Sequence, residues 1–160
     1  MNFLTNDKLV IVGAGGAIGS NMAQTALMLG LTPNICLYDI YGPGVNGVAE
    51  ELYHCAFEGA NITWTTDPEE AFTGAKYIIS SGGAPRKEGM TREDLLKGNC
   101  QIAAEFGDNI KKYCPDVNHV VHSFPTRRSS DLDEMMYLAP VKATSGSVVQ
   151  VMFAPSNAQW

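Results

Sequence analysis

The sequence lacks the features that mark several classes of protein. Its 160 residues contain no Cys-x-x-Cys pair, no cluster of cysteine and histidine, no internal repeat and no apolar run long enough to cross a membrane. No basic segment followed by an apolar stretch opens the chain, as it would in a secretory leader. These absences argue against a metal site, a disulfide framework, a repeat protein and a membrane protein. The length predicts one domain of ordinary size.

Charge is also scarce. Charged residues make up 18% of the chain, and the net charge of −6 disfavours nucleic acid and anionic membrane surfaces as partners. An apolar fraction of 45% is typical of a globular core. The four cysteines are scattered, and we expect reduced, structural, mostly buried thiols of a cytoplasmic protein. They are Cys36, Cys55, Cys100 and Cys114.

The first apolar run ends in a glycine-rich turn. Residues 9–12 (LVIV) are short, unbroken and rich in β-branched side chains, which predicts a strand buried on both faces. Glycines follow at positions 13, 15, 16 and 19, and a helical pattern then extends to about Leu29. Apolar residues recur at helical spacing along one face of that helix. They are Ile18, Met22, Ala26 and Leu29.

The glycine spacing fits Gly-x-x-Gly-x-x-Gly through Gly13, Gly16 and Gly19. A strand, a glycine turn and a helix bring backbone N–H groups and a helix N-terminus up to a phosphate. Gly13 suits the tight turn, Gly16 a close approach of the ligand, and Gly19 close packing of helix and strand. Plain strand–helix connections also use glycine turns, so the turn alone leaves both interpretations open.

A second apolar strand over residues 34–38 ends in Asp39, twenty residues after Gly19. A carboxylate at this place accepts hydrogen bonds from both ribose hydroxyls of an adenosine. The alternative is an ordinary turn or capping aspartate. Because residues 40–49 contain no arginine or lysine, nothing is offered to a 2′-phosphate, which favours NAD over NADP.

Strands and helices continue to alternate along the chain. After a turn at 41–44 we expect a helix to about Glu58, a strand at 61–65, a short helix capped by Asp67 and ended by Gly74, and a strand at 76–80. This alternation predicts an α/β fold with a parallel sheet covered on both faces. Ligands in such folds bind at the carboxyl ends of the strands.

A glycine-rich loop with three basic residues follows at 80–92, and a long helix begins after Thr91, with Asp94 completing a capping box. The apolar stripe of this helix includes one polar residue, Asn99. It is interpreted either as a buried asparagine bonded to backbone or as a contact to a ligand across the strand ends. The stripe is Leu95, Asn99, Ile102, Phe106, Ile110 and Tyr113.

Three segments together resemble the NAD-binding half of bacterial malate dehydrogenases, in the lactate/malate dehydrogenase family. They are residues 12–19 (VGAGGAIG), Asp39 and residues 82–99 (GGAPRKEGMTREDLLKGN), and the resemblance covers about residues 3–121. It implies a truncated Rossmann-type doubly wound parallel sheet, NAD as cofactor, and a cytoplasmic oxidoreductase of the tricarboxylic acid cycle whose parent enzyme is a homo-oligomer. The cofactor-binding residues implied are Gly13, Gly16, Ala17, Ile18, Gly19, Asp39, Ser81, Gly82 and Asn99.

The arginine loop implies a small dicarboxylate substrate, malate or oxaloacetate. Guanidinium groups bind carboxylates in a bidentate way. By resemblance, Arg86 clamps the substrate carboxylate distal to the reacting carbon, and Arg92 polarises the keto oxygen and helps to hold the substrate. The related lactate dehydrogenases have glutamine in place of Arg86, which favours malate here. The alternative is that Arg86 and Arg92 are solvated charges of a surface loop and do not bind substrate.

The resemblance stops after residue 121. Residues 123–132 (SFPTRRSSDL) resemble the one-frame translation of a sequencing adapter, and 133–160 form an unassigned tail in which 147–153 is expected to be a strand. We therefore divide the chain into an NAD-binding domain (1–122), a suspected artefactual insert and the tail. The family's catalytic histidine and aspartate are absent. His54, His119 and His122 match no catalytic motif.

Other functions stay open at this stage. The chain is interpreted as the cofactor half of a malate dehydrogenase, as a catalytically inactive dinucleotide-binding fragment, or as part of a lactate-type 2-hydroxy acid dehydrogenase. A sugar-nucleotide epimerase or reductase shares the fold but requires a Tyr-x-x-x-Lys pair, and no tyrosine here has lysine four residues later.

Overall fold

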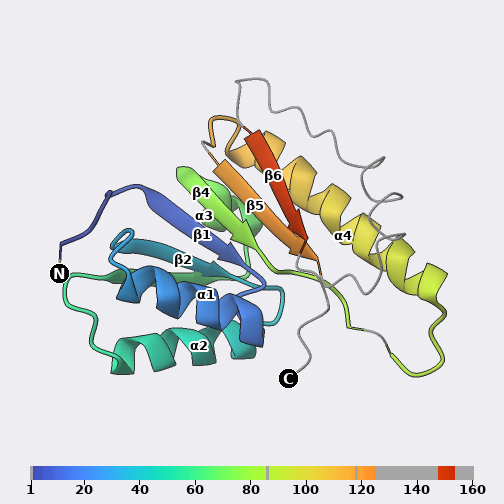
Figure 1. Cartoon of the computed structure of the whole chain (residues 1–160), viewed down its shortest axis with the longest axis horizontal. Coiled ribbons are helices and arrows are strands. Elements are labelled where there is room, and N and C mark those ends of the chain that lie inside the picture. Colours follow the sequence, from blue (N-terminus) through green and yellow to red (C-terminus); the bar gives the residue numbers. More distant parts are fainter. Residues whose placement is uncertain (1, 86, 118, 125–147, 154–160) are drawn as a thin grey trace.

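The chain folds into a six-stranded parallel sheet with helices on both faces (Figure 1). This computed structural model describes residues 2–85, 87–117, 119–124 and 148–153, the last two segments by their backbone alone. The elements in chain order are β1 (Lys8–Val12), α1 (Ala17–Met28), β2 (Asn34–Tyr38), α2 (Gly42–His54), β3 (Asn61–Thr65), α3 (Pro68–Phe72), β4 (Ala75–Ser80), α4 (Arg92–Tyr113), β5 (His119–Phe124) and β6 (Val148–Phe153).

The strand order is β3-β2-β1-β4-β5-β6, and every neighbouring pair is parallel. From β1 the chain winds outward through β2 to β3, returns to β4 on the other side of β1, and winds outward again. This is the Rossmann-type doubly wound α/β fold that the sequence predicts. The direction of winding changes between β1 and β4, where such sheets bind ligands at their carboxyl ends.

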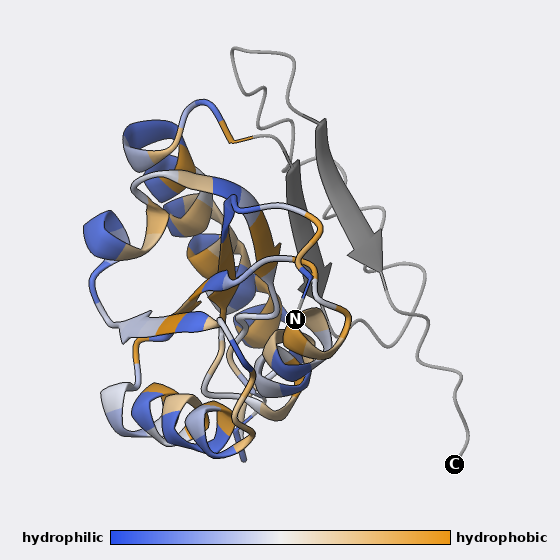
Figure 2. Cartoon of the chain, turned by 90° about the vertical axis from the view of Figure 1, so that its left-hand side faces the viewer, coloured by the Kyte–Doolittle hydropathy of each residue, from blue (hydrophilic) through white to orange (hydrophobic). Residues whose placement is uncertain are grey.

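Alternate residues of β1 enter two separate cores. Leu9 and Ile11 pack in the core that includes the buried residues of α1 and α2, whereas Val10 and Val12 pack with those of α3 and α4. Figure 2 shows the hydrophobic strands between helices whose outward faces are hydrophilic. The prediction of a first strand buried on both faces is therefore confirmed.

The apolar stripe predicted along α1 is only partly buried. Its buried residues are Gly19, Ala23, Ala26 and Leu27, whereas Ile18 is 54% exposed and Leu29 is 68% exposed. Small residues face the sheet because the glycine turn brings the start of α1 very close to β1. Of the larger apolar side chains of α1, Leu27 is fully buried, Met22 is half-buried, and Ile18 and Met28 are exposed.

The helix α2 also differs from its expected bounds. It begins at Gly42, with Pro43 in its first turn, so the expected turn at 41–44 is mostly helical. It ends at His54 rather than near Glu58, because Cys55 is its C-cap and Ala56 has φ of +49°. A left-handed residue directly after the cap is a common way to end a helix.

Local capping signals are confirmed at the other helices. The Asp67 carboxylate accepts from the Glu69 N–H at 3.0 Å at the start of α3. Thr91 and Asp94 form the predicted capping box at the start of α4. Gly30 and Gly74, which follow α1 and α3, have φ of +63° and +76°. These bonds span few residues, which explains why short sequence patterns predicted them.

The last two strands extend the sheet beyond β4. β5 runs to Phe124 and so includes the first two residues of the suspected insert; β6 confirms the strand expected at 147–153. Residues 125–147, among them Arg127 and Arg128, lie outside the described part of the chain. Within that part, no helix is both long and apolar enough to cross a membrane.

All four cysteines are free, but their burial differs from the expectation. Cys36 and Cys114 are buried as predicted, whereas Cys100 is half-buried and Cys55 is exposed at the end of α2. Burial raises the pKa of the Cys114 thiol to about 11 and also raises that of Cys36. Both buried thiols are therefore neutral at pH 7.

Candidate dinucleotide-binding site

The carboxyl ends of β1, β2 and β4 are joined by hydrogen bonds. The N–H groups of Gly13 and Ala14 donate to the Tyr38 carbonyl at 2.9 and 3.2 Å, which joins the turn after β1 to β2. The Ser81 N–H and hydroxyl both donate to the Val12 carbonyl, at 3.0 and 3.2 Å, which joins the segment after β4 to β1. Residues far apart in the sequence thus form one edge of the sheet.

Two glycines make this close approach sterically feasible. Gly13 has φ of +76°, and a Cβ placed on it would lie 2.7 Å from the Gly82 nitrogen. A Cβ on Gly19 would collide with the Gly13 carbonyl oxygen and lie 2.8 Å from the Ala14 Cα. The turn, the first helical residues and the segment after β4 can therefore pack together only with glycine at these positions.

Among the described residues, no side chain caps the N-terminus of α1. Its N-cap is Gly16, which has no side chain to cap the helix, and the first turn contains no acidic residue. Ala17 and Ile18 in this turn are exposed. Backbone N–H groups and the positive end of the helix dipole are thus available to an anion, so the residues fit a dinucleotide pyrophosphate.

Asp39 lies at the end of β2 and is held by two backbone donors. Its Oδ2 accepts from the Gly15 N–H at 2.9 Å, and its Oδ1 accepts from the Tyr41 N–H at 3.0 Å. An ionised carboxylate offers about four acceptor sites, so capacity is left for ribose hydroxyls. The neighbouring Tyr38 is neutral at pH 7, since burial and then the Asp39 charge raise its pKa.

Gly15 is a contributor that sequence reasoning missed. The Gly-x-x-Gly-x-x-Gly spacing left Gly15 without a role, yet a Cβ there would lie 3.1 Å from the Asp39 Oδ2 and 3.2 Å from the Val45 nitrogen. Glycine is therefore needed where the turn contacts both Asp39 and the start of α2. The fourth glycine of the cluster was the signal that could have revealed this contact.

The loop after β4 contains the other predicted residues. Ser81 and Gly82 contact the turn after β1, and the Asn99 Oδ1 accepts from the Ala84 N–H at 2.8 Å. The bond to the backbone is therefore confirmed, although Asn99 is half-buried rather than buried, and a ligand contact stays a prediction. Arg92 is the exposed first residue of α4, and Arg86 lies outside the described residues.

The three histidines of the chain lie on two elements, α2 and β5. His54 is exposed on the last turn of α2, at the end of a helix remote in sequence from the glycine turn. In β5, the backbone of His119 pairs with Tyr77 of β4 and that of His122 with Ser80. The side chains of these two histidines lie outside the described part of the structure. Over the described ranges, no three histidine, cysteine or acidic side chains are grouped to hold a metal ion.

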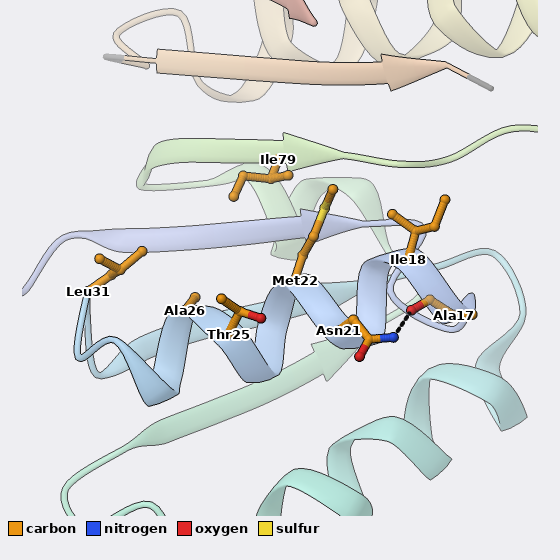
Figure 3. A pocket seen from close by; sticks show the side chains of 8 residues that line it. All are labelled: Ala17, Ile18, Asn21, Met22, Thr25, Ala26, Leu31 and Ile79. Atoms are coloured by element: carbon orange, nitrogen blue, oxygen red, sulfur yellow. Dashed lines mark hydrogen bonds between the residues drawn. The ribbon is translucent and has the colours of Figure 1, made fainter. Parts of the chain in front are cut away.

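A largely apolar groove of about 500 Å³ lies beside the site, between α1 and β4 (Figure 3). Ile18 and Met22 from α1 and Ile79 from β4 point into it. Asn21 is the polar exception, and its side-chain amide donates to the Ala17 carbonyl at 2.7 Å. Three of the four residues of the predicted apolar stripe, Ile18, Met22 and Ala26, thus line this groove.

Fold and site together define a dinucleotide-binding domain. Residues 7–145 match the family model described as lactate/malate dehydrogenase, NAD binding domain. The chain therefore belongs to the lactate/malate dehydrogenase family, and NAD is the cofactor of this domain.

Two curated relatives illustrate the similarity. The chain is 33% identical to malate dehydrogenase of Nitratiruptor sp. over 140 residues, which is 86% of this chain and 42% of the relative. It is 31% identical to mitochondrial malate dehydrogenase of Schizosaccharomyces pombe over 121 residues, which is 74% of this chain and 35% of that protein. The chain thus spans less than half the length of these relatives.

Solved structures agree. Malate dehydrogenase of Cryptosporidium parvum superimposes with a TM-score of 0.63 at 32% identity, over 74% of this chain and 38% of that one. Lactate dehydrogenase from Eimeria maxima with NADH and oxamate superimposes with a TM-score of 0.72 at 25% identity, over 95% of this chain and 45% of that one. Both branches of the family therefore share this domain.

Proposed function

We propose that this chain is the cofactor-binding half of an NAD-dependent malate dehydrogenase, which oxidises malate to oxaloacetate by hydride transfer. The observation that carries the proposal is the bond from Gly15 to Asp39, because it holds a carboxylate beside the uncapped N-terminus of α1. That pairing suits an adenosine ribose next to a pyrophosphate. The curated relatives named malate dehydrogenase support this substrate over lactate.

Each part of the site has a separate task in this proposal. The first turn of α1 binds the pyrophosphate, and Asp39 accepts from the ribose hydroxyls. Ser81, Gly82 and Asn99 lie along the path to the nicotinamide end. NAD, when bound, accepts the hydride that leaves the substrate carbon.

The substrate specificity is proposed to come from the arginine loop. Arg86 binds the carboxylate distal to the reacting carbon, and Arg92 polarises the keto oxygen and holds the substrate. The loop closes over the substrate and excludes water before hydride transfer. A lactate-type enzyme, which would have glutamine in place of Arg86, is the second candidate and is favoured by the superposition with lactate dehydrogenase.

The chain itself is proposed to bind NADH without oxidising malate. Removal of the hydroxyl proton needs a base, and a positioned acid or base contributes ~10²–10⁴-fold. In the proposed parent enzyme that histidine, its aspartate and a third arginine belong to the part beyond this chain. The parent is proposed to be a cytoplasmic homo-oligomer, and residues 123–132 an adapter-derived insert. The parent gene can be amplified independently and sequenced again. Recovery of codons 123–132 unchanged would refute the proposal that these residues derive from an adapter.

Titration of the purified chain with NADH and NADPH tests the cofactor assignment. We expect NADH to bind more tightly, because a 2′-phosphate would lie against the Asp39 carboxylate. The double variant Asp39→Ser, Ile40→Arg should narrow or reverse the preference; Ile40 is 88% exposed and so tolerates the arginine. Equal affinity of the unmodified chain for both cofactors would contradict the assignment.

A malate assay tests the proposal that the chain does not oxidise malate. NADH formation from malate and NAD by the purified chain should not exceed that of a catalytically dead malate dehydrogenase purified from the same host. That control corrects for traces of the host's own enzyme. Turnover within tenfold of ordinary dehydrogenases, whose kcat is roughly 1–10³ s⁻¹, would show that the further half is not needed.

A further inference from the structure

We propose that Asn99 is a positioning residue that holds residues 81–84, here called the loop root, against the cofactor site. The Asn99 Oδ1 accepts from the Ala84 N–H at 2.8 Å, although the two residues belong to different elements. A Cβ on Gly83 would lie 3.3 Å from the same oxygen. The Asn99 amide therefore packs directly against the loop root. The inference deepens the proposed function and rests on it.

The loop root is held at both of its ends. At its start, the N–H and hydroxyl of Ser81 donate to the Val12 carbonyl, and Gly82 packs against Gly13. At its end, Ala84 is bonded to the second turn of α4 through Asn99. These contacts thus hold Gly82 and Gly83 between β1 and α4.

The loop beyond the root is arranged differently. The Met90 N–H donates to the Lys87 carbonyl at 3.1 Å, which forms a local turn. Within it, Gly89 has φ of +82° and no atom within 4 Å of a Cβ position. Residues 87–90 thus form a turn of their own, separate from the bonds that hold the loop root. Asn99 bonds Ala84 in the loop root, the segment that contacts the glycine turn.

The chemistry of the asparagine suits this role. A neutral amide oxygen accepts the Ala84 N–H without adding a negative charge beside a dinucleotide that carries phosphates. Alanine would remove the acceptor, whereas aspartate would keep it at nearly the same place. Preorganised binding surfaces lose less entropy when a ligand binds. Loss of the bond should therefore weaken cofactor binding even if Asn99 itself does not contact the cofactor.

The test measures amide hydrogen exchange at Ala84 and NADH affinity in the full 160-residue chain. For Asn99→Ala we expect the Ala84 amide to exchange at least tenfold faster and NADH to bind several-fold more weakly. Asn99→Asp should keep the amide protected and restore NADH affinity at high ionic strength, which screens the added charge. Gln101→Ala, on an exposed position of α4, is the matched control and should change neither quantity.

Several results would overturn the proposal. Unchanged exchange of the Ala84 amide in Asn99→Ala would exclude the bond, and unchanged NADH affinity in that variant would exclude positioning. If Asn99→Asp keeps Ala84 protected but still binds NADH as weakly as Asn99→Ala at high ionic strength, the side chain acts by direct cofactor contact instead. Failure of the unmodified chain to bind NADH would refute the proposed function, while the exchange measurement would still decide the bond.

Discussion

The two glycine-rich segments of the site, the turn after β1 and the loop after β4, use glycine for different reasons. In the turn, side chains at Gly13 or Gly19 would collide with neighbouring backbone. In the loop, Gly89 has open space around it, and its positive φ is what favours glycine. The turn therefore needs glycine for packing, and the outer loop needs it for conformation.

This difference separates a turn whose glycines are closely packed from an outer loop in which Gly89 is not. The turn is bonded to β2 and to the loop root, so its geometry is determined by the sheet. In the outer loop, the Met90 N–H donates to the Lys87 carbonyl, which forms a local turn. Substitutions in the turn should therefore damage fold and cofactor binding together, whereas those in the outer loop should separate the two.

The largest effect is expected for Gly19→Ala. Because its Cβ would overlap the Gly13 carbonyl oxygen, the free energy of unfolding should fall by about 3 kcal/mol, the upper range for an overpacked core. NADH binding should be lost with it, as measured by urea unfolding and fluorescence titration. Gly98→Ala in α4 is the control: nothing lies within 4 Å of its Cβ position, and it should stabilise the chain by ~0.8–1 kcal/mol. Equal stability of Gly19→Ala and Gly98→Ala would contradict the conclusion that the turn needs glycine for packing.

The next effect concerns the substrate side of the loop. In a full-length parent enzyme, Arg86→Gln should lower kcat/KM for oxaloacetate far more than for pyruvate, because only oxaloacetate has the distal carboxylate. A charged hydrogen bond contributes ~1.5–3 kcal/mol, which corresponds to a loss of roughly ten- to a hundredfold. Steady-state kinetics with both substrates measure this. An unchanged ratio would remove Arg86 from substrate recognition.

A smaller effect is expected for Gly89→Ala. The φ of +82° costs an L-residue ~1–2 kcal/mol, and no steric clash adds to it. Stability should fall by no more than this amount in urea unfolding, and NADH affinity should be retained because the loop root is not altered. Loss of NADH binding in this variant would show that the outer loop and the cofactor cradle are coupled.

The smallest effect is a pH dependence at the start of α4. Hydrogen bonds from the Thr91 hydroxyl and N–H lower the pKa of Asp94 in the folded chain. Because the folded pKa lies below the unfolded one, the stabilisation is present above the unfolded pKa and is lost as the pH falls through the folded pKa. Unfolding curves of Asp94→Asn should therefore depend less on acid pH than those of the unmodified chain. Identical pH profiles would exclude a contribution from this capping box.

Sequence patterns predicted the parts of the fold whose causes are local. Asp67 caps α3 by a bond to Glu69, two residues away, and Thr91 pairs with Asp94, three residues away. The apolar run of β1 implies burial on both faces. These features depend on nearby backbone groups and on side-chain periodicity, which a single sequence displays.

Two local predictions failed because packing overrode the pattern. In the apolar stripe of α1, Ala26 is buried as predicted, but Ile18 and Leu29 are exposed. The close approach of α1 to β1 buries Gly19 and Ala23 instead. The helix α2 ends earlier than predicted because Ala56 adopts a left-handed conformation, which alanine rarely does and which the sequence therefore does not indicate. Helical periodicity alone cannot tell which of two apolar faces meets the sheet.

The sequence by itself determined the strands, the caps, the glycine turn and Asp39, since each results from chemistry within a few residues. Only the tertiary structure decided which of these groups meet. Ser81 bonds to Val12 across 69 positions, Gly15 to Asp39 across 24, and Ala84 to Asn99 across 15. Ser81 meets Val12 because β4 returns to the side of β1, and Gly15 meets Asp39 because β2 pairs with β1 on its other side. Ala84 meets Asn99 where the loop after β4 packs against α4. Strand order is a property of the folded sheet, and no single segment of the chain encodes it.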